Sequence, residues 1–323
     1  MKILPVLTFC LMAASYADGT EADAVVFSAY VSSDLMISGQ SVQSGTSSEL
    51  THAQDGGECT RSFQLTLVDS WDIEDWTLGM DIYEPAGYQY LLGIKKDNIT
   101  DESYVRIYDM QNDMNVIDDI TVNSLNVNPF GVVWNNASDS ESSTLMTNNH
   151  YDPADSMFIT EDFGSTWELV TDPGGYKFRG MDFDGDYYWA AASSPSNSLC
   201  RFQLGGPVEY YDLSEFGITD TPNGVAVIPQ GDELLIAVGS YYLEYLNFYS
   251  FDGSTLTFLD SVDYPDLPSH TLDQSMGLTY TETTGHLYWS YIVVPPNDFW
   301  ISELAIGETS LQRTTWGDIK SSF

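Results

Sequence analysis

The chain has 323 residues, of which 43% are hydrophobic and 14% aromatic, so it carries enough apolar material for a large core and is not intrinsically disordered. Its 48 acidic residues face only 10 basic ones, giving a formal net charge of -38. A surface with this charge repels phosphate backbones and anionic lipids, which excludes nucleic acid and membrane surfaces as partners. The carboxylates are explained by salt adaptation, by calcium binding or by the solubility of an extracellular surface.

The first 17 residues have the pattern of a cleavable signal peptide. Lys2 supplies a positive start, Ile3–Ala14 is almost entirely apolar, and Ser15–Ala17 offers small residues where a signal peptidase cleaves. The apolar run is too short for a permanent membrane span, and no later stretch reaches that length. We therefore predict a signal peptide over 1–17, an extracellular or periplasmic mature protein, and no membrane insertion.

Two cysteines remain after this segment, Cys59 and Cys200. In an exported protein they are candidates for a disulfide, although spacing alone fits two unpaired small apolar side chains equally well. The four histidines are scattered and none has a second histidine or a cysteine at the spacing of a zinc site.

A glycine followed by alternating apolar residues recurs five times, at intervals of 44 to 53 residues. After the third, fourth and fifth copies come a glycine-containing turn and a second strand rich in aromatic or branched residues. This period and content are typical of the four-stranded blades of a β-propeller. The glycines that begin the five copies are Gly79, Gly131, Gly180, Gly224 and Gly277.

The number of blades depends on the segment before the first glycine. Ser62–Asp69 resembles a fourth strand, and pairing with the last blade would close a ring of five and remove its open edge. If Ala24–Tyr30 begins a degenerate blade, the ring has six. We predict an all-β propeller domain over 59–323, with five or six antiparallel blades, preceded by a linker or degenerate blade over 18–58.

Residues 160–167 of the second repeat read Thr-Glu-Asp-Phe-Gly-Ser-Thr-Trp, between two predicted strands. This resembles the Asp-box of sialidase-like propellers. The resemblance covers eight residues and implies a structural turn, in which the aspartate accepts backbone N–H groups and the glycine takes positive φ. The matching positions are Thr160, Asp162, Gly164, Thr166 and Trp167.

Sialidase chemistry does not follow from this turn. The resemblance implies three arginines that clamp a carboxylate, whereas Arg106 and Arg201 lie on predicted third strands, away from the channel. Arg179 alone precedes an inner strand, and the net charge opposes an anionic sugar.

Ligands of propellers bind where loops meet at one mouth of the central channel, and the residues before the inner-strand glycines line that mouth. Polar residues occur there in every repeat, so we predict this set as the ligand site, although a wet channel mouth would have the same composition. The residues are Asp75, Thr77, Asn128, Arg179, Asn223 and Gln274.

The fold does not determine the function, and no catalytic constellation stands out among so many carboxylates. The sequence favours a non-catalytic extracellular module that binds a glycan or a protein. One alternative is a propeller-type carbohydrate-active enzyme, a glycoside hydrolase or lyase with acid and base carboxylates at the channel mouth. Another is a calcium-stabilised structural protein of the cell surface.

Overall fold

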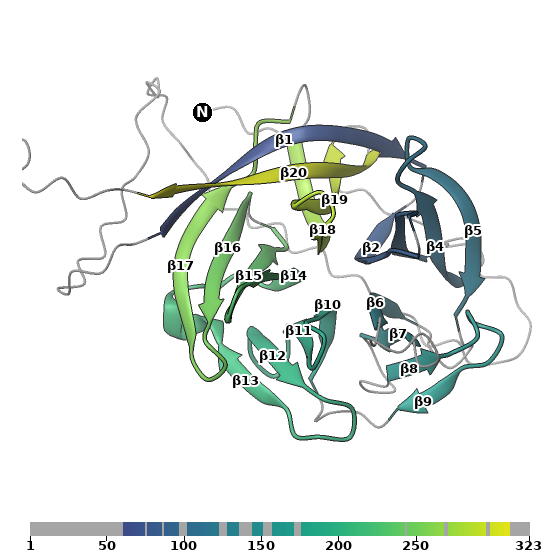
Figure 1. Ribbon diagram of the computed structural model, residues 1–323, viewed down its shortest axis with the longest axis horizontal. Coiled ribbons are helices and arrows are strands. Elements are labelled where there is room, and N and C mark those ends of the chain that lie inside the picture. Colours follow the sequence, from purple (N-terminus) through teal and green to yellow (C-terminus); the bar gives the residue numbers. More distant parts are fainter. Residues whose placement is uncertain are drawn as a thin grey trace, which may run out of the picture. The chain divides into compact units, whose positions relative to one another are not determined.

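The five glycine-led segments form the innermost strands of five sheets in the computed structural model of the protein (Figure 1). Each sheet has four antiparallel strands and the sheets form a ring, so the fold is a five-bladed β-propeller. The predicted fold class is confirmed, with the lower of the two blade counts. The structure describes residues 61–74, 76–85, 87–96, 102–122, 128–135, 144–150, 157–170, 176–242, 244–267, 271–294 and 298–310.

The predicted signal peptide over 1–17 and the segment over 18–58 lie outside the described residues, as do Cys59 and Asp75. The chain divides into two units, Met1–Gly56 and Gly57–Phe323, and every described residue belongs to the second.

Each of the first four blades is built from four consecutive strands, with the inner strand first in the chain. Blade 1 comprises β2 (Thr77–Tyr83), β3 (Tyr90–Lys96), β4 (Ser103–Asp109) and β5 (Asn115–Thr121). Blade 2 comprises β6 (Pro129–Asn135), β7 (Thr144–Asn149), β8 (Met157–Thr160) and β9 (Glu168–Val170). Blade 3 comprises β10 (Phe178–Phe183), β11 (Tyr188–Ala192), β12 (Ser198–Phe202) and β13 (Glu209–Asp212). Blade 4 comprises β14 (Pro222–Gln230), β15 (Glu233–Ser240), β16 (Tyr245–Phe251) and β17 (Leu256–Asp263).

The fifth blade combines the two ends of the propeller. From the channel outward its first three strands are β18 (Thr271–Thr281), β19 (His286–Val294) and β20 (Asp298–Ser310), and its outer strand is β1 (Arg61–Ile73). The long β1 runs antiparallel beside β20 across the top of Figure 1, which confirms the predicted closing strand. Because β1 pairs with β20, the first and last strands of the propeller are joined in one blade, which closes the ring.

The start of β1 also reaches the neighbouring blade. The backbone N–H of Phe63 donates a hydrogen bond of 2.9 Å to Asp260 Oδ2 of β17, and its ring stacks on Phe248 at 4.6 Å. Blades 4 and 5 are therefore held together by apolar packing and by a side-chain-to-backbone bond.

The recurring glycine has a steric cause, because neighbouring inner strands approach each other closely around the channel. A Cβ atom at Gly79 would lie 2.5 Å from the carbonyl oxygen of Phe130 on β6. A Cβ atom at Gly180 would lie 2.6 Å from the carbonyl oxygen of Asn223 on β14. Only glycine allows this approach, so the sequence repeat records the contact between inner strands.

Between the sheets, large aromatic side chains fill the space, as expected for wedge-shaped blades. Trp189 and Trp289 are each 0% exposed. The only helix among the described residues is a four-residue 3-10 turn at Leu213–Phe216, and that part of the chain contains no helix able to cross a bilayer.

Candidate functional site at the channel mouth

The channel mouth is the end of the ring at which the five inner strands begin. Some of the predicted site residues contact one another there, and others do not. Thr77 is almost fully buried and its hydroxyl lies 2.7 Å from the hydroxyl of Tyr108, within blade 1. Asn128 bonds through its backbone N–H to Asn149 Oδ1 at 3.1 Å. Neither of these bonds joins the residue to the other predicted positions.

Three predicted residues, Arg179, Asn223 and Gln274, do come together, joined by Tyr241, which was not predicted. We call these four residues the mouth network. Arg179 donates to Asn223 Oδ1 at 3.3 Å, and its guanidinium carbon lies 4.7 Å from the centre of the Tyr241 ring. Tyr241 in turn donates its hydroxyl proton to Gln274 Oε1 at 2.9 Å. Blades 3, 4 and 5 are thus linked by a cation, an aromatic face and two amides, groups that recognise hydroxyls.

His150, at the end of β7, lies beside this network. Its Nδ1 is 2.9 Å from the carbonyl oxygen of Phe178, so Nδ1 carries the proton, because a carbonyl can only accept. Burial, with the charge of Arg179 as a second cause, lowers the pKa of His150 to about 4. The imidazole is therefore neutral near pH 7 and adds no second positive charge beside Arg179.

A cavity of about 310 Å³ opens on the mouth face between blades 4 and 5. Tyr264 and Trp289, whose rings stack at 3.6 Å, are among its lining residues, and both are buried. Two carboxylates, Glu244 and Asp266, border it, and both are exposed. We call it the mouth pocket, and it is lined by Glu244, Tyr264, Pro265, Asp266, Leu267, Thr271, Leu272 and Trp289.

Ser275 of β18 forms hydrogen bonds to residues of both the mouth pocket and the mouth network. Its hydroxyl lies 3.2 Å from the hydroxyl of Tyr264 and accepts from Trp289 Nε1 at 2.9 Å. Its backbone N–H donates to the carbonyl oxygen of Tyr241 at 3.0 Å. The buried Ser275 therefore connects the mouth pocket to the mouth network through hydrogen bonds.

Sequence reasoning missed the mouth pocket. Glu244 comes from the loop between the second and third strands of blade 4, and Asp266 from the connection to blade 5. Both loops reach the mouth because strand direction alternates along a blade. The order of the predicted strands was therefore enough to indicate which loops lie at the mouth. Among 48 acidic residues, nothing local distinguished these two.

Two further carboxyls lie inside the ring, on inner strands. Asp81 of β2 accepts the backbone N–H of Trp134 on β6 at 2.5 Å, and Asp182 of β10 accepts that of Val227 on β14 at 2.6 Å. Burial raises the pKa of Asp81 to about 7. Burial, then the charge of Asp81, raises the pKa of Asp182 well above its usual range. These carboxyls connect adjacent blades.

The turn at residues 160–167 has the geometry predicted for it. Asp162 Oδ1 accepts the backbone N–H of Thr166 at 2.8 Å and the hydroxyl proton of Thr160 at 2.8 Å. Gly164 has φ 85°. The indole N–H of Trp167 donates to the carbonyl oxygen of Thr121 in blade 1 at 3.1 Å, so the turn ties two blades together.

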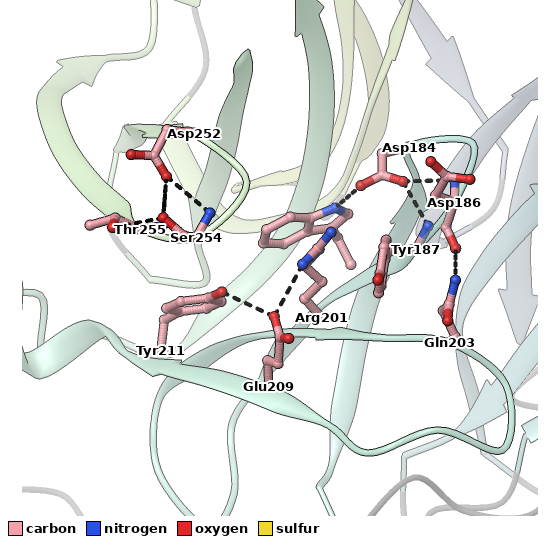
Figure 2. A network of polar contacts seen from close by, with 11 residues as sticks. Asp184, Asp186, Tyr187, Arg201, Gln203, Glu209, Tyr211, Asp252, Ser254 and Thr255 are labelled. Carbon is pink, nitrogen blue, oxygen red and sulfur yellow. Dashed lines mark hydrogen bonds and ion pairs between the residues drawn. The ribbon is translucent and has the colours of Figure 1, made fainter. Parts of the chain in front are cut away.

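The remaining arginines on third strands have structural roles. Arg201 of β12 pairs with Glu209 of β13 at 3.2 Å, and its guanidinium lies 3.5 Å from the centre of the Tyr187 ring. Figure 2 shows this cluster with the neighbouring turns of Asp184 and Asp252. Arg106 of β4 likewise pairs with Asp119 of β5 at 2.8 Å. Their places on third strands agree with the sequence-based expectation.

The candidate disulfide and the alternative of calcium stabilisation remain predictions. Cys200 is 0% exposed, and burial raises the pKa of its thiol to about 12. Its predicted partner Cys59 lies outside the described residues. Within the described ranges, no group of three or more His, Cys, Asp or Glu side chains is placed to hold a metal ion.

No protein-family model matches the sequence, and no curated protein matches it significantly. Among solved structures, a GH43_1 enzyme from Xanthomonas citri in complex with xylotriose is similar over 74% of this chain and 89% of its own, with 8% identity and a TM-score of 0.51. An exo-β-1,3-galactanase from Phanerochaete chrysosporium, in complex with β-1,3-galactotriose, is similar over 74% of this chain and 64% of its own, with 11% identity and a TM-score of 0.50. These likenesses establish the propeller fold.

Proposed function

We propose that the protein is a secreted carbohydrate-active enzyme of the propeller type, a glycoside hydrolase that acts at the mouth pocket. The observation that carries this proposal is the pocket itself, a concave site of about 310 Å³ whose lining includes two aromatic side chains and two exposed carboxylates. Hydrolysis of a glycosidic bond uses one carboxyl as general acid and a second as base or nucleophile. Glu244 and Asp266 are the candidates for this pair.

The neighbouring mouth network supports the same chemistry. Sugar hydroxyls can reach the amide of Gln274 and the guanidinium of Arg179, which are both partly exposed. The similar propellers crystallised with xylotriose and β-1,3-galactotriose add support for a saccharide as the ligand. They fit the enzyme alternative of the sequence analysis better than its first choice, a non-catalytic module.

The test is the release of reducing ends from xylan and β-1,3-galactan by the full-length protein and by three variants. We expect E244Q and D266N each to lower the rate by about 10²- to 10⁴-fold, the usual contribution of a positioned acid or base. D232N is the matched control, because Asp232 is an exposed carboxylate in the β14–β15 turn at the other end of blade 4, and it should keep the wild-type rate.

Wild-type rates in both E244Q and D266N would overturn the assignment of the pocket. Binding of the saccharides without turnover by the wild-type protein would overturn hydrolysis and favour the non-catalytic module. Products with an ultraviolet-absorbing double bond would overturn hydrolysis in favour of a lyase. Unchanged melting temperatures in the variants are required, so that a lost rate reports chemistry.

A further inference from the structure

A row of five aromatic rings lies on the face opposite the channel mouth, where the inner strands end. Neighbouring rings are 6.2 Å apart from Tyr88 to Tyr90, 6.0 Å from Tyr90 to Tyr83, and 5.6 Å from Tyr83 to Phe163. Trp134 contacts the last two, at 4.4 Å from Tyr83 and 5.1 Å from Phe163. We call these five residues the aromatic platform. It runs from blade 1 to blade 2.

The two ends of the aromatic platform are open to solvent. Tyr88 is 57% exposed and Phe163 is 43% exposed, whereas Trp134 is buried and supports the row from below. Large exposed aromatic side chains that contact one another in a row are uncommon on a protein without a ligand for them, because each leaves apolar area in water.

Phe163 is also held in a strained backbone conformation. Its φ is 52°, in the left-handed region that bulky side chains avoid at a cost of about 1 to 2 kcal/mol. The turn that resembles the Asp-box maintains this conformation, through bonds from Gly164 N–H to Thr160 Oγ1 and from Thr166 N–H to Asp162 Oδ1, each 2.8 Å. Maintained strain at an exposed ring indicates that the position of the ring matters.

The border of the aromatic platform is polar and acidic. Glu84 accepts from Gln89 Nε2 at 2.6 Å and from the hydroxyl of Thr283 at 3.2 Å. Carboxylate and amide groups beside aromatic faces suit sugar hydroxyls, which donate and accept at the rim while C–H groups stack on the rings. The net charge of -38 repels an anionic ligand and leaves a neutral one unaffected.

We infer that the aromatic platform is a second carbohydrate-binding surface, which takes a neutral polysaccharide chain. It stands apart from the mouth pocket and does not depend on hydrolysis there. If both sites act, a chain bound to the platform keeps the mouth close to its substrate and raises the effective substrate concentration.

The experiment measures retention of the full-length protein on insoluble xylan, β-1,3-galactan, β-1,3-glucan and cellulose. We expect at least one polymer to retain the wild-type protein, and Y88A to weaken that retention about tenfold, since one stacked ring contributes about 1 to 1.5 kcal/mol. F163N should weaken it similarly without lowering the melting temperature through backbone strain, because asparagine tolerates positive φ. The matched control is Y210A, since Tyr210 on β13 is 59% exposed and lies in blade 3.

No retention of the wild-type protein on any of the four polymers would overturn the inference. Equal loss in Y210A and Y88A would also overturn it, as would full retention by both Y88A and F163N. E244Q separates this site from the proposed function. Lost hydrolysis with intact retention in E244Q supports the aromatic platform as a separate site. Normal hydrolysis with unchanged retention in Y88A overturns the aromatic platform and leaves the mouth pocket as the proposed site.

Discussion

The buried carboxyls of the inner strands should make the stability of the propeller fall as the pH rises. In the unfolded chain Asp81 ionises at its ordinary pKa of 3.8, whereas burial raises this pKa to about 7 in the fold. Between these values unfolding releases a proton, so the stabilising contribution is complete below about pH 4 and is lost as the pH rises through 7. The rise in pKa corresponds to on the order of 4 kcal/mol.

The perturbation is D81N, which keeps the shape and one oxygen acceptor but cannot ionise. At pH 4.5 the wild-type carboxyl is protonated and neutral, as the amide is, and D81N exchanges one oxygen for an NH2 group, so the free energies of unfolding should differ by only about 1 to 2 kcal/mol. Between pH 4.5 and 8 the wild-type protein should lose about 3 kcal/mol more than D81N does, because part of the contribution is already lost at pH 4.5. Urea unfolding followed by tryptophan fluorescence at a series of pH values measures this difference.

The exposed carboxylates add their own pH dependence, and D232N accounts for it. Asp232 is exposed, so its replacement should leave the pH profile parallel to that of the wild-type protein. Parallel profiles for D81N and wild type would refute the reasoning, because they would mean that Asp81 has the same pKa in the folded and unfolded chains.

Three further substitutions test the contacts that hold the ring. G79A should destabilise the fold by about 3 kcal/mol or more in chemical denaturation, because its methyl group would collide with the backbone of Phe130. D260A should lower the free energy of unfolding by about 1 to 3 kcal/mol, because the backbone N–H of Phe63 loses its acceptor. R201K should lower the melting temperature by a few degrees, since an ammonium group replaces a planar guanidinium that lies over aromatic rings.

Each of these three substitutions has a control variant or an outcome that would contradict its physical explanation. G307A is the control for G79A, because a Cβ there meets nothing closer than 3.6 Å, and equal losses would contradict the steric account. D260N retains one acceptor oxygen and should recover part of the stability lost in D260A. A melting temperature in R201K equal to that of the wild-type protein would show that the charge alone, paired with Glu209, stabilises the cluster.

The sequence was sufficient for the architecture because the blade contacts are repeated and local. A glycine is required wherever two inner strands contact each other, so Gly79 and its four equivalents identify the strands that line the channel. The turn at Thr160–Trp167 was identified from its residues because Asp162 forms its bonds within that turn. The closing strand was recognisable from its apolar alternation, and pairing with β20 settled the count at five blades.

The sites depended on tertiary structure, because each combines residues distant in the chain that carry no local signature. Glu244 and Asp266 line one pocket only because two separate loops reach the mouth, and Tyr88 and Phe163 join one row only when blades 1 and 2 are adjacent. Aspartates and tyrosines are abundant throughout this chain, so composition cannot single out the functional ones. The propeller ring brings the site residues together. The inner strands pack closely at the glycines, and this packing sets the positions of the blades that carry the site residues.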